Sequence, residues 1–576
     1  MQHNYEFLKD LNDIQKSVCV SADNFILTAC PGSGKTRTIT YRIAYLAVKY
    51  NESKKLNIAI TYTNRAADEI ENRLLNMSIS THNVWTGTIH QFCMKFIIRP
   101  YSMYHEKLSK GYTIIDEYVK EKYIKVIAKE LGNKSYVKEL YKNSYVMGKY
   151  YAKIEQNKEI DFDLILQYSQ ELIEENSFIA QNVASTIRSI HVDEYQDTNE
   201  RQYKILASII NVYKDINLLF VGDVNQAIYR NLGGVAKSAK EIRNLFHINF
   251  TEKCLDGCYR STQRIVDYYV NYEVAPTGVF SVSETRDADG IIKFDSTVHK
   301  DELSVKIAEI VREELGKDIP EEEICIVAPQ WYQIYPMANK LRKILPDSNF
   351  DAPDITPIKY DPLNIFCLIA KLLFTQKSGH ALLRRKVADE ILIILKEDYG
   401  FIISEKVSKL EILKAINATQ FIIDDGVLTL KNAISNVFEI LKIKKNGDIE
   451  KICNQFFGKI DSRLTEHKLP YDCEAMVRSF KEKNGIVINT IHGVKGEEYK
   501  TVIGFDLLNG HLPHWDYIMK PELKELKQEE TNKMLYVLCS RSKENLYLFS
   551  ERGRITNKGT SYRITDELAI CMFDYD

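Results

Sequence analysis

The chain has 576 residues, of which 45% are hydrophobic and 27% are charged, and its net charge is −2. At roughly 100–200 residues per domain this length corresponds to about three to five domains, and the composition excludes wholesale disorder. Because the net charge is close to zero, no global basic field marks the chain as a nucleic-acid-binding protein. Any surface of that kind must be local.

Apolar runs and cysteines indicate where the protein resides. No apolar run approaches the roughly 18 residues that a membrane span needs. The first residues, MQHNYEFLKDLND, are polar and acidic, unlike a signal peptide. Among the 11 scattered cysteines, Cys254 and Cys258 form a CxxxC, but no second pair or nearby His completes a zinc site. We therefore expect a cytoplasmic protein with reduced thiols and no membrane partner.

Strand-like apolar runs alternate with helical patterns in the first half of the chain. The runs NFILTA, LNIAITYT, SIHVDEYQD and INLLFVGD occupy residues 24–29, 56–63, 189–197 and 216–223. After the second run, Ala66, Ile70 and Leu74 recur at helical spacing. This alternation predicts a parallel α/β sheet. Residues 104–187 interrupt it with Tyr-, Lys- and Glu-rich helical sequence, which predicts an inserted helical subdomain.

A second α/β set follows, with strand-like runs at residues 290–296, 322–329, 484–493, 499–507 and 544–550. The pattern between them turns helical again, which predicts a second insertion. We thus predict a first α/β domain of residues 1–103 and 188–270 with the insertion 104–187. The second α/β domain comprises residues 271–377 and 479–576, with the insertion 378–478.

The segment ACPGSGKTRT, residues 29–38, follows a predicted strand and opens a predicted helix. It fits the phosphate-loop pattern GxxxxGK[ST], with Ala29 in place of the leading glycine. Glycines allow a tight turn in which successive N–H groups hold phosphate at a helix N-terminus. We expect Lys35 to reach the β- and γ-phosphates and Thr36 to bind Mg²⁺. Gly32, Ser33 and Gly34 would complete the ATP cradle.

Two acidic residues emerge at the end of another predicted strand, in HVDEYQDTN, residues 191–199. A nucleotide loop needs an acidic metal partner at the end of another strand. We expect Asp193 to hold Mg²⁺, directly or through water. Glu194 would then be placed to polarise the attacking water.

Motifs in a fixed order resemble superfamily 1 helicases of the UvrD/PcrA/Rep type. LNDIQKSVC, ACPGSGKT, AITYTNRAADEI and TGTIHQF resemble the Q motif and motifs I, Ia and Ib. VDEYQD, VGDVNQAIY, CYRST, TIHGVKGEEYKTV and MLYVLCSRSKENLYL resemble motifs II to VI. The resemblance covers nearly the whole chain. It implies two RecA-like P-loop NTPase domains, 1A and 2A, with helical insertions 1B and 2B.

The resemblance also implies roles at the nucleotide. Gln15 would read adenine, and Arg37 and Tyr259 would sandwich the ring. Gln226 would touch the γ-phosphate, and Glu498 would bind the ribose. Arg260 and Arg541 would be arginine fingers. Phosphoryl transfer needs positioning and positive charge more than covalent chemistry. An arginine from a second domain supplies its charge only when the domains are closed, so it would couple hydrolysis to domain closure.

For the nucleic acid, Tyr62 and Tyr229 are aromatic residues just after predicted strands, as base-stacking platforms require. Short polar residues suited to phosphates and sugars accompany them: Thr63, Asn64, Thr88, His90 and His492. We expect such contacts to tolerate any sequence and to be sensitive to salt.

One stretch departs from the family. UvrD-like enzymes usually follow the motif III tyrosine with Gly-Trp-Arg-Gly, whereas here Tyr229 is followed by Arg230, Asn231 and Leu232. A base-stacking tryptophan is therefore replaced by Asn231, and an arginine by Leu232. Stacking is worth roughly 1–3 kcal/mol per base, so DNA grip or stepping would change. Arg230 could compensate by a cation–π or phosphate contact.

Two functions follow from this sequence. The first is an ATP-dependent DNA helicase or translocase, expected to run 3′→5′ on single-stranded DNA, in DNA repair or anti-phage defence. The second is a nucleotide- and DNA-sensing regulatory subunit with little processive unwinding. The helical insertions are also shorter than in typical UvrD-like members, and this reduced form resembles GajB, the UvrD-like subunit of Gabija anti-phage systems. That resemblance implies an OLD-family (ATPase–Toprim) nuclease partner such as GajA.

Overall fold

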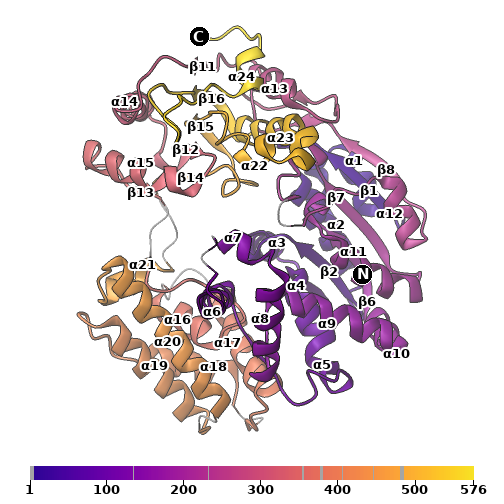
Figure 1. Cartoon of the computed structure of the whole chain (residues 1–576). Coiled ribbons are helices and arrows are strands. Elements are labelled where there is room, and N and C mark those ends of the chain that lie inside the picture. Colours follow the sequence, from indigo (N-terminus) through magenta and orange to yellow (C-terminus); the bar gives the residue numbers. More distant parts are fainter. Residues whose placement is uncertain are drawn as a thin grey trace. The chain divides into compact units, whose positions relative to one another are not determined.

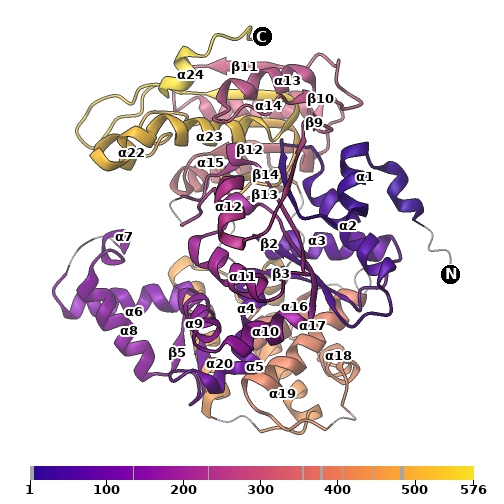
Figure 2. The same cartoon turned by 90° about the vertical axis from the view of Figure 1, so that its right-hand side faces the viewer.

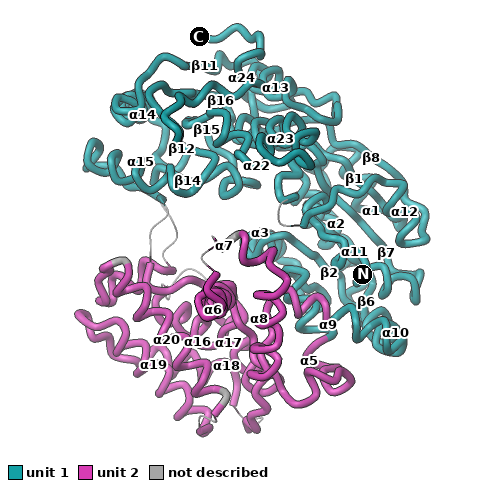
Figure 3. The backbone as a smooth tube through the Cα atoms, in the orientation of Figure 1, with its two compact units in different colours: residues 1–97, 169–353, 484–576 teal, residues 98–168, 354–483 magenta. Residues whose placement is uncertain are grey.

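The computed structural model describes residues 5–133, 135, 137–230, 233–352, 356–375, 381–404, 407–444, 447–480 and 485–576 (Figure 1). The chain divides into two compact units (Figure 3). Unit 1 comprises residues 1–97, 169–353 and 484–576, and unit 2 comprises residues 98–168 and 354–483. This division into two units does not test the limits of the four domains predicted from the sequence, which remain a prediction.

Unit 1 contains two six-stranded parallel sheets, as expected for two RecA-like domains. The first sheet has the order β3 (Val84–Thr88), β2 (Leu56–Thr61), β6 (Ile187–Val192), β7 (Asn217–Gly222), β1 (Phe25–Ala29) and β8 (Thr251–Leu255). The second has the order β11 (Ile292–Asp295), β16 (Ser542–Phe549), β15 (Tyr499–Gly504), β12 (Ile324–Ala328), β14 (Ile486–Thr490) and β13 (Phe350–Asp351). Every strand predicted from an apolar run is confirmed.

Helices cover both faces of the first sheet (Figure 2). On one face lie α1 (Asp13–Val20), α2 (Lys35–Lys49) and α3 (Asn64–Asn76). On the other lie α10 (Ser177–Ser185), α11 (Glu200–Val212) and α12 (Ala239–Phe246). Phe25, Leu27 and Ala29 alternate along β1 into the core shared with α1, α2 and α3. A parallel sheet buried on both faces explains why its inner strands are continuous apolar runs.

The second sheet follows the same rule. Ile324, Ile326 and Ala328 of β12 pack with α14 (Leu303–Leu315) and α15 (Trp331–Ile344). Cys325 and Val327 point to the opposite core, which α13 (Gln263–Tyr269) and α23 (Lys527–Cys539) cover. This alternation is the two-residue period of a strand, so α23 is fixed on one face of the sheet.

Smaller elements complete unit 1. They are α4 (Ile89–Cys93), α22 (Trp515–Met519), α24 (Asp566–Ile570) and the strand pair β9 (Gly257–Cys258) and β10 (Phe280–Ser281). The edge strands β3, β8 and β13 were not predicted from the sequence. An edge strand lacks a neighbour on one side, and Thr251, Glu252 and Lys253 of β8 are exposed, so no apolar run marks it.

Unit 2 is mainly helical, as predicted for the two insertions. Its first segment holds α5 (Arg99–Tyr101), α6 (Glu117–Glu130), α7 (Val137–Leu140), α8 (Ser144–Gln156), the start of α9 (Phe162–Glu175) and the strand pair β4 (Thr113–Ile114) and β5 (Glu159–Ile160). The second holds α16 (Ile365–Phe374), α17 (Ala381–Ile393), α18 (Lys409–Asn417), α19 (Gly426–Ile440), α20 (Gly447–His467) and α21 (Cys473–Arg478). The segments are joined by ion pairs such as Arg99 Nε–Asp398 Oδ1, 2.7 Å, and Lys459 Nζ–Asp116 Oδ2, 2.9 Å.

Candidate functional site

The predicted phosphate loop lies between β1 and α2. Gly34 caps α2 with φ +83°, and Gly32 has φ +72°, a region that favours glycine. A Cβ at Gly32 would lie 2.6 Å from the Cβ of Arg260, and one at Gly34 would lie 2.9 Å from Nε2 of Gln15. The loop is thus packed closely on Gln15, which is predicted to read adenine, and on Arg260, a predicted arginine finger. Its N–H groups open a 15-residue helix.

Gln15 fixes the back of this loop. Its side chain and that of Asn12 form the capping box of α1, and Nε2 also donates to Ser33 O at 3.1 Å. Gln15 is 2% exposed. The predicted adenine contacts flank the same N-terminal segment. Arg37 donates to Asp10 O and lies over the Tyr41 ring, whereas the Tyr259 hydroxyl accepts from Asn12. The predicted roles of Gln15, Arg37 and Tyr259 remain predictions.

The acidic pair at the end of β6 faces the phosphate loop. Asp193 Oδ2 accepts a hydrogen bond from Thr36 Oγ1 at 3.5 Å, and Glu194 Oε1 lies 3.7 Å from Lys35 Nζ. Glu194 has φ +49°. Burial and the neighbouring Glu194 raise the pKa of Asp193, while burial of Glu194 is outweighed by Lys35 and Lys495, which lower its pKa. Lys35 and Lys495 thus favour the charged form of Glu194.

Arg541 reaches the loop after β7 from the second sheet. It follows α23 and is 1% exposed. Its Nη2 donates to Gln226 Oε1 at 2.9 Å, while Nε and Nη1 donate to Val537 O and Glu497 O. Gln226 Nε2 in turn donates to Asp223 Oδ2 at 2.7 Å. The predicted γ-phosphate sensor and the predicted arginine finger are thus in direct contact.

Arg260, which follows the first sheet, also contacts residues of the second domain. Its Nε donates to Glu498 Oε2 at 2.8 Å, and Nη1 donates to Ser540 O, the residue before Arg541. Burial would raise the pKa of Glu498, but Arg260 and Lys543 lower it. Arg260 therefore contacts the turn that carries Arg541, and it also binds the residue predicted to contact the ribose.

Lys495 is a residue of the site that sequence reasoning missed. Its Nζ lies 2.5 Å from Asp197 Oδ2 and from Gln226 O, and 5.0 Å from the centre of the Tyr229 ring. Its side chain is only 6% exposed. Burial raises the pKa of Asp197 to about 6, with Lys495 acting against that rise. Its position inside TIHGVKGEEYKTV was the only sequence signal for it.

The predicted nucleic-acid aromatics gather in one cluster. The rings of Tyr62 and Tyr229 stack with centres 4.6 Å apart. The Tyr229 hydroxyl donates to His492 O at 3.0 Å, and His492 Nε2 lies 3.2 Å from Ile228 O. Tyr62 is 40% exposed. The structure thus brings together three of the predicted residues, from the ends of β2, β7 and β14.

The short polar residues are used partly for capping. Thr63 accepts from Ala66 N as the N-cap of α3, and Thr88 forms a capping box with Gln91 at the start of α4. Oδ1 of Asn64 is buried and accepts no hydrogen bond from the residues that the structure describes. His90 lies in the first turn of α4 and is half-buried. Their contacts with nucleic acid remain predictions.

Two family models match the chain. The UvrD/REP helicase N-terminal domain matches residues 11–144 and 131–247, and the UvrD-like helicase C-terminal domain matches residues 374–553. The chain belongs to the UvrD/REP helicase family. It is similar to the ATP-dependent DNA helicase PcrA of Staphylococcus aureus, with 23% identity over 619 residues, 92% of this chain and 81% of that protein. The PcrA of Staphylococcus epidermidis is 23% identical over 638 residues, 95% of this chain and 84% of its own length.

This helicase is therefore an ATP-hydrolysing enzyme of superfamily 1, and its side chains fit Mg²⁺. Magnesium usually keeps several waters and takes only one or two protein ligands. Thr36 and Asp193 offer one hydroxyl and one carboxylate within 3.5 Å of each other. Among the described residues, no cluster of three or more His, Cys, Asp or Glu side chains that could hold a metal ion occurs.

The structure describes only part of the stretch after Tyr229 that differs from the family. Asn231 and Leu232 lie outside the described residues. Arg230 is described, and its Nη1 lies 3.8 Å from Glu529 Oε1 and 3.6 Å from Glu530 Oε1. Both glutamates belong to the first turn of α23. In this helicase Arg230 is thus engaged with carboxylates of the protein.

The remaining sequence expectations concern cysteines and membranes. Cys254 is half-buried, and Cys258 is fully buried beside Gly32. Across the described ranges, no helix combines the length and the apolar composition that a membrane span requires.

Proposed function

We propose that this ATP-dependent DNA helicase couples ATP hydrolysis to 3′→5′ movement along single-stranded DNA. The observation that carries the proposal is the hydrogen bond from Arg541 to Gln226. It joins a turn of the second sheet to the loop that follows β7 in the first. Because the 3′→5′ direction rests on family resemblance alone, it needs its own test.

At the phosphates each residue has a separate proposed task. Lys35 binds the β- and γ-phosphates at the start of α2. Thr36 and Asp193 hold Mg²⁺, which when bound supplies positive charge beside the phosphate oxygens. Glu194 polarises the attacking water. Arg260 and Arg541 add positive charge that stabilises the transferring phosphoryl group, and Arg541 does so from the second domain, only when the domains are closed.

Around the nucleoside, Gln15, Arg37 and Tyr259 contact adenine, and Glu498 contacts the ribose. Tyr259 supports this proposal because its ring is 47% exposed while its backbone N–H is held by Gly32 O at 2.9 Å. An exposed ring on a fixed backbone is suited to stacking on a base.

Coupling to DNA would pass through the loop after β7. Gln226 and Tyr229 are three residues apart in this loop, and both contact Lys495. Loss of the γ-phosphate would change the position of Gln226, and Lys495 would transmit that change to the aromatic cluster of Tyr62, Tyr229 and His492. Thr63, Asn64, Thr88 and His90 would contact the backbone nearby.

Lys35→Ala tests the nucleotide site. We expect the variant to lose ATP hydrolysis by at least about 100-fold, because one positive donor to the transferring group is removed. Turnover is measured with and without single-stranded DNA, with the exposed Lys54→Ala as a matched control. A wild-type turnover that DNA leaves unchanged would count against the motor, and hydrolysis by Lys35→Ala would count against the site.

Unwinding of duplexes with a 3′ or a 5′ tail tests the direction. Unwinding from 5′ tails only would overturn it. DNA-stimulated hydrolysis without unwinding from either tail would favour the regulatory function, as a subunit of a Gabija-like complex with an OLD-family nuclease. Under either function, a role in DNA repair or in anti-phage defence is a separate proposal.

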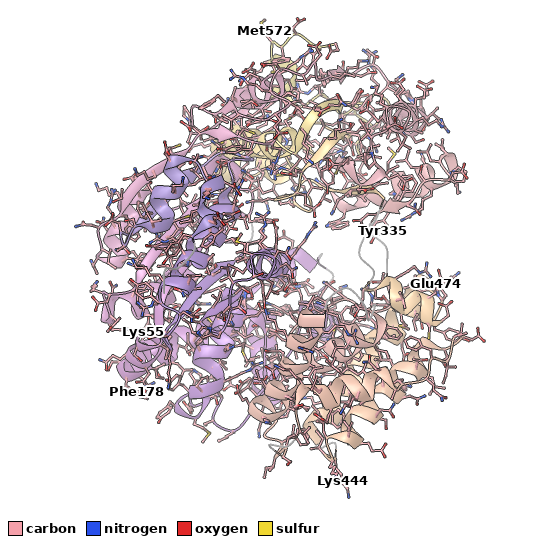
Figure 4. All side chains as sticks on the ribbon, turned by 180° about the vertical axis from the view of Figure 1, so that it is seen from behind. Lys55, Phe178, Tyr335, Lys444, Glu474 and Met572 are labelled. Atoms are coloured by element: carbon pink, nitrogen blue, oxygen red, sulfur yellow. The ribbon has the colours of Figure 1, made fainter. Side chains whose placement is uncertain are left out.

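Exposed aromatic residues at the start of α15, which follows the strand paired with β14, support the nucleic-acid proposal. Trp331 and Tyr335 of α15 are 53% and 37% exposed, with rings 6.5 Å apart; Tyr335 is labelled in Figure 4. Ala328 of β12 pairs with Thr490 of β14, so Trp331 and His492 follow neighbouring strands at the same sheet edge. Trp and Tyr faces of this kind accept any base.

Trp331→Ala is expected to weaken single-stranded DNA binding by about fivefold to tenfold, within the range for one lost stacking partner. Trp331→Phe, which keeps a ring, should bind almost as tightly as the wild type. Anisotropy of a labelled oligonucleotide measures the affinity at several salt concentrations. Equal affinity of the alanine variant would remove Trp331 from the DNA site.

A further inference from the structure

Helix α23 meets the loop after β7 at both of its ends. At its C-terminal end, Arg541 donates to Gln226. In its first turn, Glu529 and Glu530 lie within 3.8 Å of Arg230. Residues 226 and 230 belong to one short segment, so a single helix of the second domain contacts one loop of the first domain at two separated points.

The carboxylates that face Arg230 differ in their surroundings. Glu529 Oε1 also lies 2.5 Å from Lys533 Nζ, so a second cation already neutralises this carboxylate. The Glu529 side chain is about one-third exposed. Glu530 has a side chain that is 7% exposed, and its Oε1 accepts no hydrogen bond from the described part of the chain. Burial raises the pKa of Glu530, with Lys533 and Arg230 opposing the rise. A carboxylate buried this far is costly when a nearby cation is removed.

The loop can transmit a change from Arg230 to Gln226. Asp223 holds Asn225 N and Gln226 Nε2 through its two oxygens. Asn225 Nδ2 donates to Ala275 O at 2.8 Å, and Tyr229 O accepts from Gly234 N at 3.2 Å. Because these hydrogen bonds hold the backbone on both sides of the stretch from Gln226 to Arg230, the two residues are expected to move as one body.

We propose that Arg230 is a positioning residue for ATP hydrolysis: its ion pairs with Glu529 and Glu530 hold α23 on the loop and so keep Arg541 aligned with Gln226. This rests on the proposed function, in which Arg541 acts on the phosphates. The clamp forms between the two RecA-like domains, so it stabilises their closed arrangement. It also gives a structural role to the residue that stands where the family usually has glycine.

The competing role for Arg230 is a phosphate contact with DNA. The two roles differ in what DNA must supply. A clamp acts on hydrolysis even without DNA, because the residues it aligns are all in the protein. A phosphate contact changes DNA affinity and its dependence on salt, and leaves DNA-free hydrolysis unchanged.

The test measures DNA-free ATP hydrolysis of the full chain. Arg230→Ala should lower kcat about fivefold with KM changed less than twofold, the size expected for a partly exposed ion pair that acts on alignment. Arg230→Lys, which keeps the charge, should recover most of the loss. The double variant Glu529→Gln with Glu530→Gln should lower kcat similarly, and combining it with Arg230→Ala should add little.

Each outcome decides the proposal. Unchanged DNA-free kcat in Arg230→Ala, or fully additive effects of the two sides of the clamp, would overturn it. A loss confined to DNA affinity, with a smaller salt slope, would assign Arg230 to DNA instead. If the wild type hydrolyses ATP and Lys35→Ala does not, such results contradict the clamp alone. A wild type without Lys35-dependent hydrolysis would contradict both the clamp and the proposed function.

Discussion

Replacing Arg541 with alanine is expected to slow ATP hydrolysis by about 10³–10⁵-fold, the range reported for removal of an arginine finger. Arg541 carries the only guanidinium that donates to Gln226 within the described ranges, with Nη2 2.9 Å from Oε1. Its other nitrogens are fixed by backbone oxygens of Val537 and Glu497, so the group is preorganised. Preorganised charge needs no rearrangement at the moment of reaction, which is why its loss should fall on kcat.

The buried position of Arg541 makes controls necessary. A cavity at a 1% exposed side chain could lower stability, so thermal unfolding of Arg541→Ala is measured beside its kinetics. Arg541→Lys keeps one positive charge but not the planar fork, and we expect it to remain at least about 100-fold slow. Arg286→Ala removes an arginine that is 53% exposed and should behave as the wild type. A folded Arg541→Ala enzyme within tenfold of wild-type kcat would contradict the finger role.

The sequence predicts the inner strands and the phosphate loop because local physics determines both. A strand buried on two faces must be apolar along its length, and a loop that approaches phosphate needs glycine. Edge strands such as β8 carry no such signal, since Thr251 and Lys253 face solvent. The motifs likewise place Thr36 and Asp193 on two loops of one sheet, and the structure brings their side chains within 3.5 Å of each other.

Contacts between distant segments were beyond sequence reasoning. Lys495 and Asp197 are 298 residues apart, and only the packing of two domains decides that they pair. The ion pairs of Arg230 depend on the same packing. One local signal was available: Thr88 and Gln91 have the T-x-x-Q spacing of a capping box, so capping could have been predicted beside nucleic-acid contact.

Glu194→Gln is expected to lower kcat by about 10²–10⁴-fold, the usual contribution of a general base, while ATP still binds. The substitution keeps the size of the side chain and an oxygen that can accept from Gln196 Nε2, now 2.5 Å from Oε2. It removes the charge that faces Lys35 at 3.7 Å. Lys35 then has one carboxylate fewer beside it, so its attraction for the phosphates should not weaken.

The neighbouring carboxylate gives the matched control. Asp193→Asn removes the proposed Mg²⁺ ligand beside Thr36, so it should weaken Mg²⁺-dependent nucleotide binding as well as hydrolysis. Nucleotide binding is measured with a fluorescent ATP analogue at several Mg²⁺ concentrations, and kcat is measured from phosphate release. Glu194→Gln should separate the two quantities, and Asp193→Asn should change both. If Glu194→Gln kept kcat within about threefold of the wild type, its loss would be far below that of a general base, and another group would have to orient the water.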